Sequence, residues 1–135
     1  GPNCYLEVMA PDPNQPEPPH PRPFDLDDPA VHTMLEAEPC LIAWVARTPA
    51  LDAVVARLGP RAGEIRAMRR GDLSWRLAMP PQRQDMDNIV PALIQWDGTN
   101  AAKRLKDSHV RLVALEAEHP EAEAVRAALR ERGLE

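Results

Sequence analysis

The chain has 135 residues, 44% hydrophobic and 27% charged, a balance typical of one soluble globular domain rather than of a disordered or fibrous protein. Its net charge of −5 and its scattered basic residues argue against a nucleic-acid partner. No apolar run approaches the roughly 18 residues of a membrane helix and no secretory signal is recognisable, so the sequence predicts a soluble, cytoplasmic protein without a membrane partner.

The first predicted strand covers residues 3–10, which are rich in strand-forming residues and alternate in character. It ends before Pro11 and Pro13, because proline has no backbone N–H to donate to a neighbouring strand. Residues 11–39 are a connection rich in proline, which favours extended backbone and excludes a central strand. Within this connection Pro29 is a good first helical residue, and apolar residues at helical spacing predict a short helix over 29–37.

A nearly continuous apolar run at 41–46 predicts a strand that is covered by other structure and central in its sheet. Thr48 can cap a helix that begins at Pro49 and stops at Gly59. Three more strands are expected at 64–69, 73–79 and 89–96, the first two joined by a hairpin turn at Arg70-Gly71-Asp72.

The last predicted strand spans residues 109–118, and a helix opens at Pro120 with acidic residues early and basic residues late. An offset of 71 residues aligns this pair with the earlier strand and helix. Thr48 then meets His119, Pro49 meets Pro120, and several Ala, Val and Leu positions coincide. The sequence therefore predicts an internal repeat.

The order strand, helix and three-stranded meander over residues 40–97 is similar to the βαβββ module of the vicinal oxygen chelate superfamily. Within it the chain resembles the glyoxalase-like domains most, in Cys4-Tyr-Leu-Glu-Val-Met-Ala-Pro-Asp-Pro13, Leu73-Ser-Trp-Arg-Leu77 and Pro91-Ala-Leu-Ile-Gln-Trp96. His119-Pro120 before the last helix also fits. These are strand and turn patterns rather than catalytic signatures, so they transfer a fold more firmly than a function.

The resemblance implies an α+β fold with a curved mixed sheet and helices on its outer face. It divides the single domain 1–135 into the last strand of a first module (3–10), the connection (11–39), one complete module (40–97) and the strand and helix of a further module (109–133). Relative to the family pattern the chain is truncated at both ends. Unpaired strand edges would then seek a partner, and a homodimer is one expectation.

In metal-dependent members a Glu on the strand that resembles Tyr5-Leu-Glu7-Val binds the ion, so Glu7 is the one candidate ligand that the resemblance implies. Leu41, Ile42 and Ala43 stand where a His ligand is expected, and Gln95 stands where an acidic ligand is expected. No two histidines have chelating spacing, and Cys4 and Cys40 lack the paired spacing of a zinc site. We therefore expect free, buried thiols and no metal cofactor.

Three tryptophans, Trp44, Trp75 and Trp96, lie on three strands of the complete module, where aromatic rings suit either a ligand cleft or the core. Arg76 can bind a carboxylate in such a cleft, or form an ordinary surface ion pair. The predicted ligand-lining residues are Glu7, Trp44, Trp75, Arg76 and Gln95.

Three functions stay open from the sequence. The first is a glyoxalase-like domain that binds a small organic ligand without a catalytic metal. The second is a metal-dependent lyase, isomerase or dioxygenase of the same superfamily, whose other metal ligands come from another segment or subunit. The third is a non-catalytic dimerisation or interaction module, for which the proline-rich arm and the exposed strand edges are the motivation.

Overall fold

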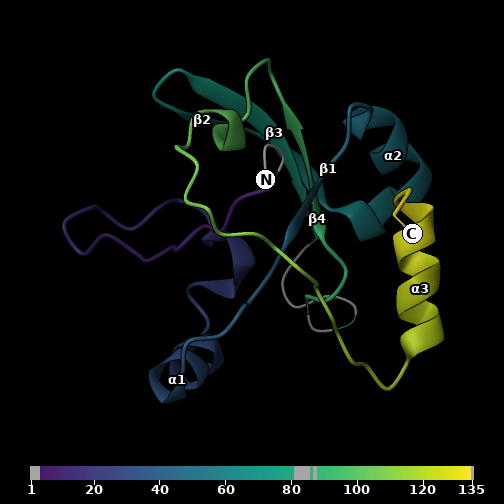
Figure 1. Cartoon of the computed structure of the whole chain (residues 1–135), viewed down its shortest axis with the longest axis horizontal. Coiled ribbons are helices and arrows are strands. Elements are labelled where there is room, and N and C mark those ends of the chain that lie inside the picture. The colour runs from purple at the N-terminus through teal and green to yellow at the C-terminus, as the bar shows by residue number, and fades with distance from the viewer. Residues whose placement is uncertain (1–3, 81–85, 87, 135) are drawn as a thin grey trace.

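The fold is taken from a computed structural model that describes residues 4–80, 86 and 88–134 (Figure 1). It contains four strands, three α-helices and three short 3-10 helices. In chain order these are η1 (Pro23–Asp25), α1 (Pro29–Ala37), β1 (Val45–Arg47), α2 (Leu51–Leu58), η2 (Gly59–Ala62), β2 (Glu64–Arg70), β3 (Leu73–Met79), β4 (Ala92–Trp96), η3 (Ala101–Lys103) and α3 (Ala122–Glu131).

The four strands form one mixed sheet in the order β1-β4-β3-β2. β1 pairs parallel with β4, while β4 with β3 and β3 with β2 are antiparallel. The predicted hairpin between β2 and β3 is present, but its turn is one residue shorter than predicted: Arg70 pairs with Leu73, so only Gly71 and Asp72 form the turn, and Gly71 takes the positive φ of 61° that such turns need. This βαβββ arrangement confirms the predicted α+β fold.

α1 begins at a side-chain cap, and α2 follows a side-chain turn just before its first residue. The Asp28 side chain accepts a hydrogen bond from the Ala30 amide at 2.7 Å, and Pro29 opens α1. Thr48 Oγ1 accepts from the Ala50 amide at 3.2 Å just before α2. These caps are readable in sequence, and for this reason the helix predictions agree with the structure within a few residues.

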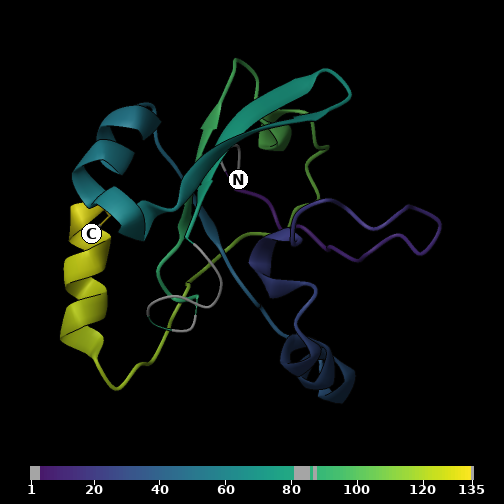
Figure 2. The same cartoon turned by 180° about the vertical axis from the view of Figure 1, so that it is seen from behind.

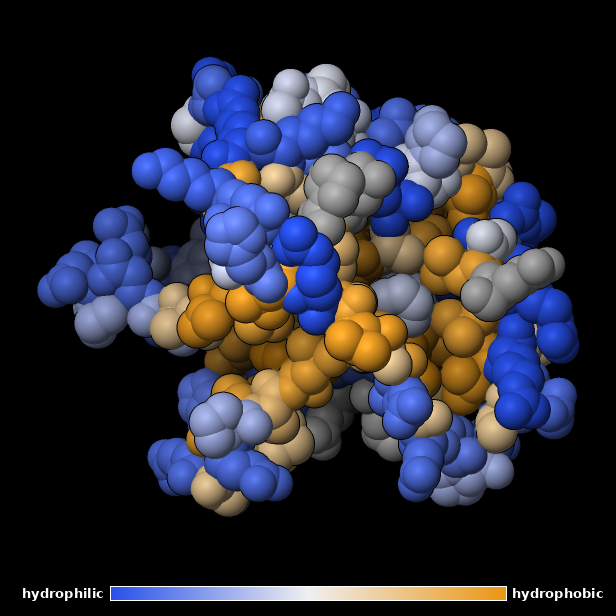
Figure 3. Space-filling view, in the orientation of Figure 1, coloured by the Kyte–Doolittle hydropathy of each residue, from blue (hydrophilic) through white to orange (hydrophobic). Residues whose placement is uncertain are grey.

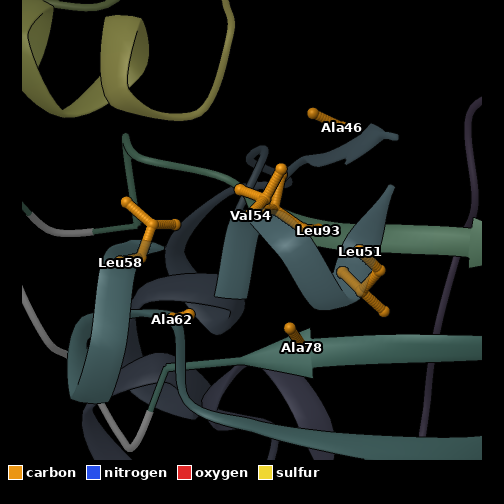
Figure 4. Packing of buried hydrophobic residues seen from close by; sticks show 7 residues of the cluster. All are labelled: Ala46, Leu51, Val54, Leu58, Ala62, Ala78 and Leu93. Carbon is orange, nitrogen blue, oxygen red and sulfur yellow. The ribbon is translucent and has the colours of Figure 1, made fainter. Parts of the chain in front are cut away.

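The main hydrophobic core lies between α2 and one face of the sheet. Leu51, Val54 and Leu58 of α2 meet strand side chains (Figure 4), and Leu51 is fully buried. The whole buried cluster is Ala46, Leu51, Val54, Leu58, Ala62, Ala78 and Leu93. Burying such side chains stabilises a fold by roughly 1.5–3 kcal/mol each.

Helices α2 and α3 lie on one side of the sheet, and α1 and the proline-rich loop lie on the other (Figures 1 and 2). α3 is tied to the α2 side by polar contacts. The Arg57 guanidinium donates to the Glu131 carbonyl at 2.6 Å, and Arg61 pairs with the Glu131 carboxylate at 2.8 Å. Leu134, just beyond α3, packs against the main core.

The prediction of a central strand over 41–46 is wrong. The strand is shorter, Val45–Arg47, and it forms the edge of the sheet. Leu41 is 60% exposed and Val45 is 37% exposed, so this apolar run is not covered on both faces. The apolar composition correctly indicated a strand. It does not indicate whether a further strand pairs with the other edge of β1, and in the structure none does among the described residues.

The strands predicted over 3–10 and 109–118 are also wrong for the described residues, of which Asn3 is not one. Residues 4–10 and 109–118 belong to no sheet, and their side chains are exposed, Val8 by 92% and Val113 by 96%. A strand requires a neighbour to accept its ladder hydrogen bonds, and propensity alone does not supply one.

The two helices of the predicted repeat begin 71 residues apart, at Leu51 and Ala122. The turns that precede the two helices are equivalent. His119 Nδ1 accepts a hydrogen bond from the Glu121 amide at 3.0 Å, and Thr48 Oγ1 accepts one from the Ala50 amide, which is also two residues further along the chain. The second strand of the repeat is the part that remains unpaired.

Cys4 and Cys40 are free, as predicted, but exposed rather than buried. Among the described residues no helix has the length and apolar character required to cross a membrane.

Candidate functional site

Alternation along the strands divides the side chains of the sheet between two faces. The first faces α2 and carries Ala78 and Leu93. The second, which we call the open face, carries Leu77, Ala92 and Ile94 as a second apolar cluster. The partly buried side chains packed against that cluster are Phe24, Met68, Trp75, Met79 and Trp96.

An aromatic pair marks one end of the open face. Trp75 of β3 and Trp96 of β4 are register partners, with ring centroids 5.1 Å apart and planes inclined by 43°. Such tilted pairs contribute about 0.5–1.5 kcal/mol beyond the area that they bury. Both rings are half-buried, so part of each remains accessible to a ligand.

Arg70 adds positive charge to this aromatic pair. Its guanidinium carbon lies 6.0 Å from the Trp75 ring centroid, at the outer limit of a cation–π contact. Arg70 Nη1 also donates to Glu7 Oε1 at 3.1 Å. The Arg70 side chain is 62% exposed and that of Glu7 is 37% exposed, so the ion pair is a surface one.

The N-terminal segment reaches the same end of the sheet through Tyr5 and Glu7. Burial raises the pKa of the half-buried Tyr5 hydroxyl, and the neighbouring Glu7 carboxylate raises this pKa further, while Arg70 acts in the opposite direction. We refer to Tyr5, Glu7, Arg70, Trp75 and Trp96 as the aromatic–arginine cluster. It combines flat rings, one guanidinium and one carboxylate over the buried apolar cluster of Leu77, Ala92 and Ile94.

Of the five residues predicted to line a cleft, the structure brings only Glu7 and Trp75 together. Arg76 and Gln95 are register partners on the face toward α2. Trp44 packs against the core on that same face, and its Nε1 donates to the Ile89 carbonyl at 2.7 Å.

Arg76 and Gln95 both hold α2 on the sheet. Arg76 makes a two-pronged ion pair with the carboxylate of Asp52, both N–O distances being 2.8 Å. Hydrogen bonding from this guanidinium lowers the pKa of Asp52. Gln95 Oε1 accepts from the Leu51 amide at 2.9 Å and so satisfies one free donor at the start of α2.

The cluster members not predicted as site residues are Tyr5, Arg70 and Trp96. A sequence signal for Arg70 existed. A two-residue turn at Gly71 and Asp72 makes Arg70 pair with Leu73, which places Arg70 two residues from Met68 and on the same face as Trp75. Strand alternation therefore favours Arg70 rather than Arg76 as the arginine on the same face as Trp75.

The described residues around Glu7 do not fit a divalent metal. The Glu7 carboxylate lies against the Arg70 guanidinium, whose charge opposes a cation at the same oxygen. Within the part of the chain that the structure describes, no three His, Cys, Asp or Glu side chains are grouped closely enough to hold an ion.

A cavity of about 230 Å³ lies between α3 and the chain flanking β4. Its lining residues are Arg61, Pro80, Met86, Val90, Ala124, Ala127, Ala128, Glu131 and Arg132. None of these residues belongs to the aromatic–arginine cluster, and none was predicted as a site residue.

Comparison with protein-family models matches residues 2–133 to the glyoxalase-like domain. Comparisons with curated proteins and with solved structures found no match. The matched region covers nearly the whole chain, and it agrees with the βαβββ order of the sheet. The chain therefore belongs to the glyoxalase-like domain family.

Proposed function

We propose that this domain binds a small organic acid with a flat, apolar body at the aromatic–arginine cluster, without a catalytic metal. The observation that carries the proposal is the half-buried Trp75–Trp96 pair with the exposed Arg70 guanidinium beside it. Rings offer stacking surface, and a guanidinium fork matches a carboxylate.

The ion pair between Arg70 and Glu7 is compatible with such a ligand. Exposed pairs of this kind contribute little to stability, so an incoming carboxylate can take the place of Glu7 at low cost. The half-buried rings of Trp75 and Trp96, which pack over the buried Leu77 and Ile94, then face the hydrophobic part of the ligand.

Isothermal titration with benzoate, indole-3-carboxylate and phenylpyruvate tests the proposal, with benzamide as the uncharged comparison. At least one acid is expected to bind, and Arg70→Gln is expected to weaken it about tenfold, because one charge-assisted contact is lost. Arg69→Gln is the matched control, since Arg69 lies on the face toward α2. Equal binding by both variants, or no binding of any acid at 10 mM, contradicts the proposal.

Glu7→Gln separates this function from a metal-dependent enzyme. Our proposal predicts that the variant binds the acid at least as tightly as wild type, because a competing carboxylate has been removed, and that EDTA has no effect. A stoichiometric metal in the purified protein that is lost in Glu7→Gln would instead favour the metal-dependent lyase, isomerase or dioxygenase.

A further inference from the structure

Arg66 of β2 has no carboxylate partner among the described residues. Acidic residues outnumber basic ones 21 to 16 in this chain, and hydrophilic side chains cover much of its periphery in Figure 3. Most described arginines accordingly form an ion pair with a carboxylate, namely Arg22, Arg61, Arg70, Arg76, Arg104, Arg111 and Arg126. Arg66 is half-buried, yet its side chain forms no ion pair or hydrogen bond with any described residue. Its N–H donors are therefore available to a ligand.

The strand register places Arg66 beside the aromatic–arginine cluster. Met68 lies directly opposite Trp75 on the open face. Two residues from Met68, on either side of it, lie Arg66 and Arg70, and strand alternation puts them on this same face. Both are therefore diagonal neighbours of Trp75, about 7–8 Å away between Cα atoms and within reach of a long side chain. Trp75 thus has one arginine on each side.

The two arginines differ in their surroundings. Arg70 is exposed and pairs with the Glu7 carboxylate at 3.1 Å. Arg66 is less exposed, and even Glu64, two residues away on the same face, forms no ion pair with it. Four residues of β2 separate the two arginines, roughly 13 Å between Cα atoms. A flat ligand with one carboxylate at Arg70 therefore extends over Trp75 toward Arg66.

We propose that the acid bound at the aromatic–arginine cluster is a flat dicarboxylic acid, whose second carboxylate binds Arg66. This inference rests on the proposed function and names the class of acid. A guanidinium fork then matches a carboxylate at each end of the ligand, and the Trp75 ring between them supports its flat body. Because Arg66 is half-buried, water and salt screen its contact less than they screen the contact at Arg70.

Arg47 of β1 is a further arginine on the open face, where it lies opposite Ile94. It also forms no ion pair with a described residue, but it is exposed and lies at the far edge of the sheet from β2. A ligand anchored at Arg70 must cross both tryptophan rings to reach it. Arg47 therefore provides a charge-matched control for Arg66.

Two diacids and their monoamides test the inference in isothermal titrations of the full chain. Terephthalate is compared with 4-carbamoylbenzoate, and 2,6-naphthalenedicarboxylate with 6-carbamoyl-2-naphthoate, so that each pair differs only in the second carboxylate. At least one diacid is expected to bind about tenfold more tightly than its monoamide. Arg66→Gln should remove this advantage and leave the affinity for the monoamide within about twofold, because only the second contact is lost. Arg47→Gln should retain the advantage.

Failure of this inference differs from failure of the proposed function. If the monoamides bind but neither diacid binds more tightly, the acid site stands and the second carboxylate site is overturned. The same follows if Arg47→Gln removes the advantage and Arg66→Gln does not. An equal loss of affinity for monoamide and diacid in Arg66→Gln also overturns it, because Arg66 would then support the face rather than bind the second carboxylate. If no acid of either kind binds, both the inference and the proposed function fail.

Discussion

Two arginines of the central hairpin have different surroundings. Arg76 is committed to Asp52 of α2 by two hydrogen bonds, whereas Arg70 lies exposed beside Trp75 with Glu7 as its ion-pair partner. The difference follows from strand alternation, which points Arg76 toward the helix and Arg70 toward the open face. We assign the first to stability and propose the second for binding.

Asp52→Asn tests the stabilising pair at the residue scale. In the folded wild-type protein the Arg76 guanidinium lowers the pKa of the Asp52 carboxyl. The ion pair therefore stabilises the fold above the unfolded pKa of about 3.9, and this stabilisation is lost as the pH falls through the lower folded pKa. The variant should therefore have a slightly lower urea midpoint than wild type at pH 7, and this difference should shrink below pH 4. In an Arg76→Gln background, Asp52→Asn should show no such pH-dependent difference, because the guanidinium that lowers the pKa of Asp52 is absent. A difference for Asp52→Asn alone that grows toward acid pH would contradict the assignment.

Two glycines give a second test at this scale. A Cβ at Gly63 would lie 1.6 Å from the Met79 carbonyl oxygen, whereas a Cβ at Gly71 would meet no atom within 4 Å. Both have positive φ, which alone costs an L residue roughly 1–2 kcal/mol. Gly71→Ala should lose about that much unfolding free energy in urea denaturation, and Gly63→Ala clearly more. Equal losses would contradict the close approach of the strand end to Gly63.

At the scale of elements, α2 provides the main hydrophobic anchor of the sheet. Leu51 is fully buried at its first position, so Leu51→Ala should reduce the free energy of unfolding by roughly 2–5 kcal/mol. Leu105→Ala removes the same atoms from a side chain that is 58% exposed, and it should change the free energy of unfolding by less than about 0.5 kcal/mol. Similar losses in the two variants would mean that α2 does not anchor the core.

Helices and the hairpin were predictable from the sequence because their signals are local. Pro29 after Asp28, Thr48 before α2, and the Gly71-Asp72 turn each act within a few residues. The segments 4–10 and 109–118 show the limit of this reasoning. Their composition favours strands, but a strand depends on a distant neighbour that the described chain does not provide.

The candidate site was predictable only in part for a related reason. Trp75 and Glu7 lie in one side-chain group, whereas Trp44, Arg76 and Gln95 fall on the opposite face. The residue types alone indicated binding chemistry. Assigning them to a face required the register of β2, β3 and β4, which only the Arg70–Leu73 turn fixes in the sequence.

At the scale of the whole molecule, the sheet separates stability from proposed function. One face carries the core under α2, and the other carries the aromatic–arginine cluster. The exposed segment 110–117 lies outside both. The glyoxalase-like fold thus presents two faces whose roles can be tested separately.

The three tryptophans provide the most direct test of the proposed binding face, because they are divided between the two faces of the sheet. In a ¹H–¹⁵N NMR titration with the acid that binds most tightly, the indole signals of Trp75 and Trp96 should shift together and saturate. The indole signal of Trp44, which donates to the Ile89 carbonyl on the other face, should stay in place. A saturating shift of Trp44 with Trp75 and Trp96 unmoved would contradict the account.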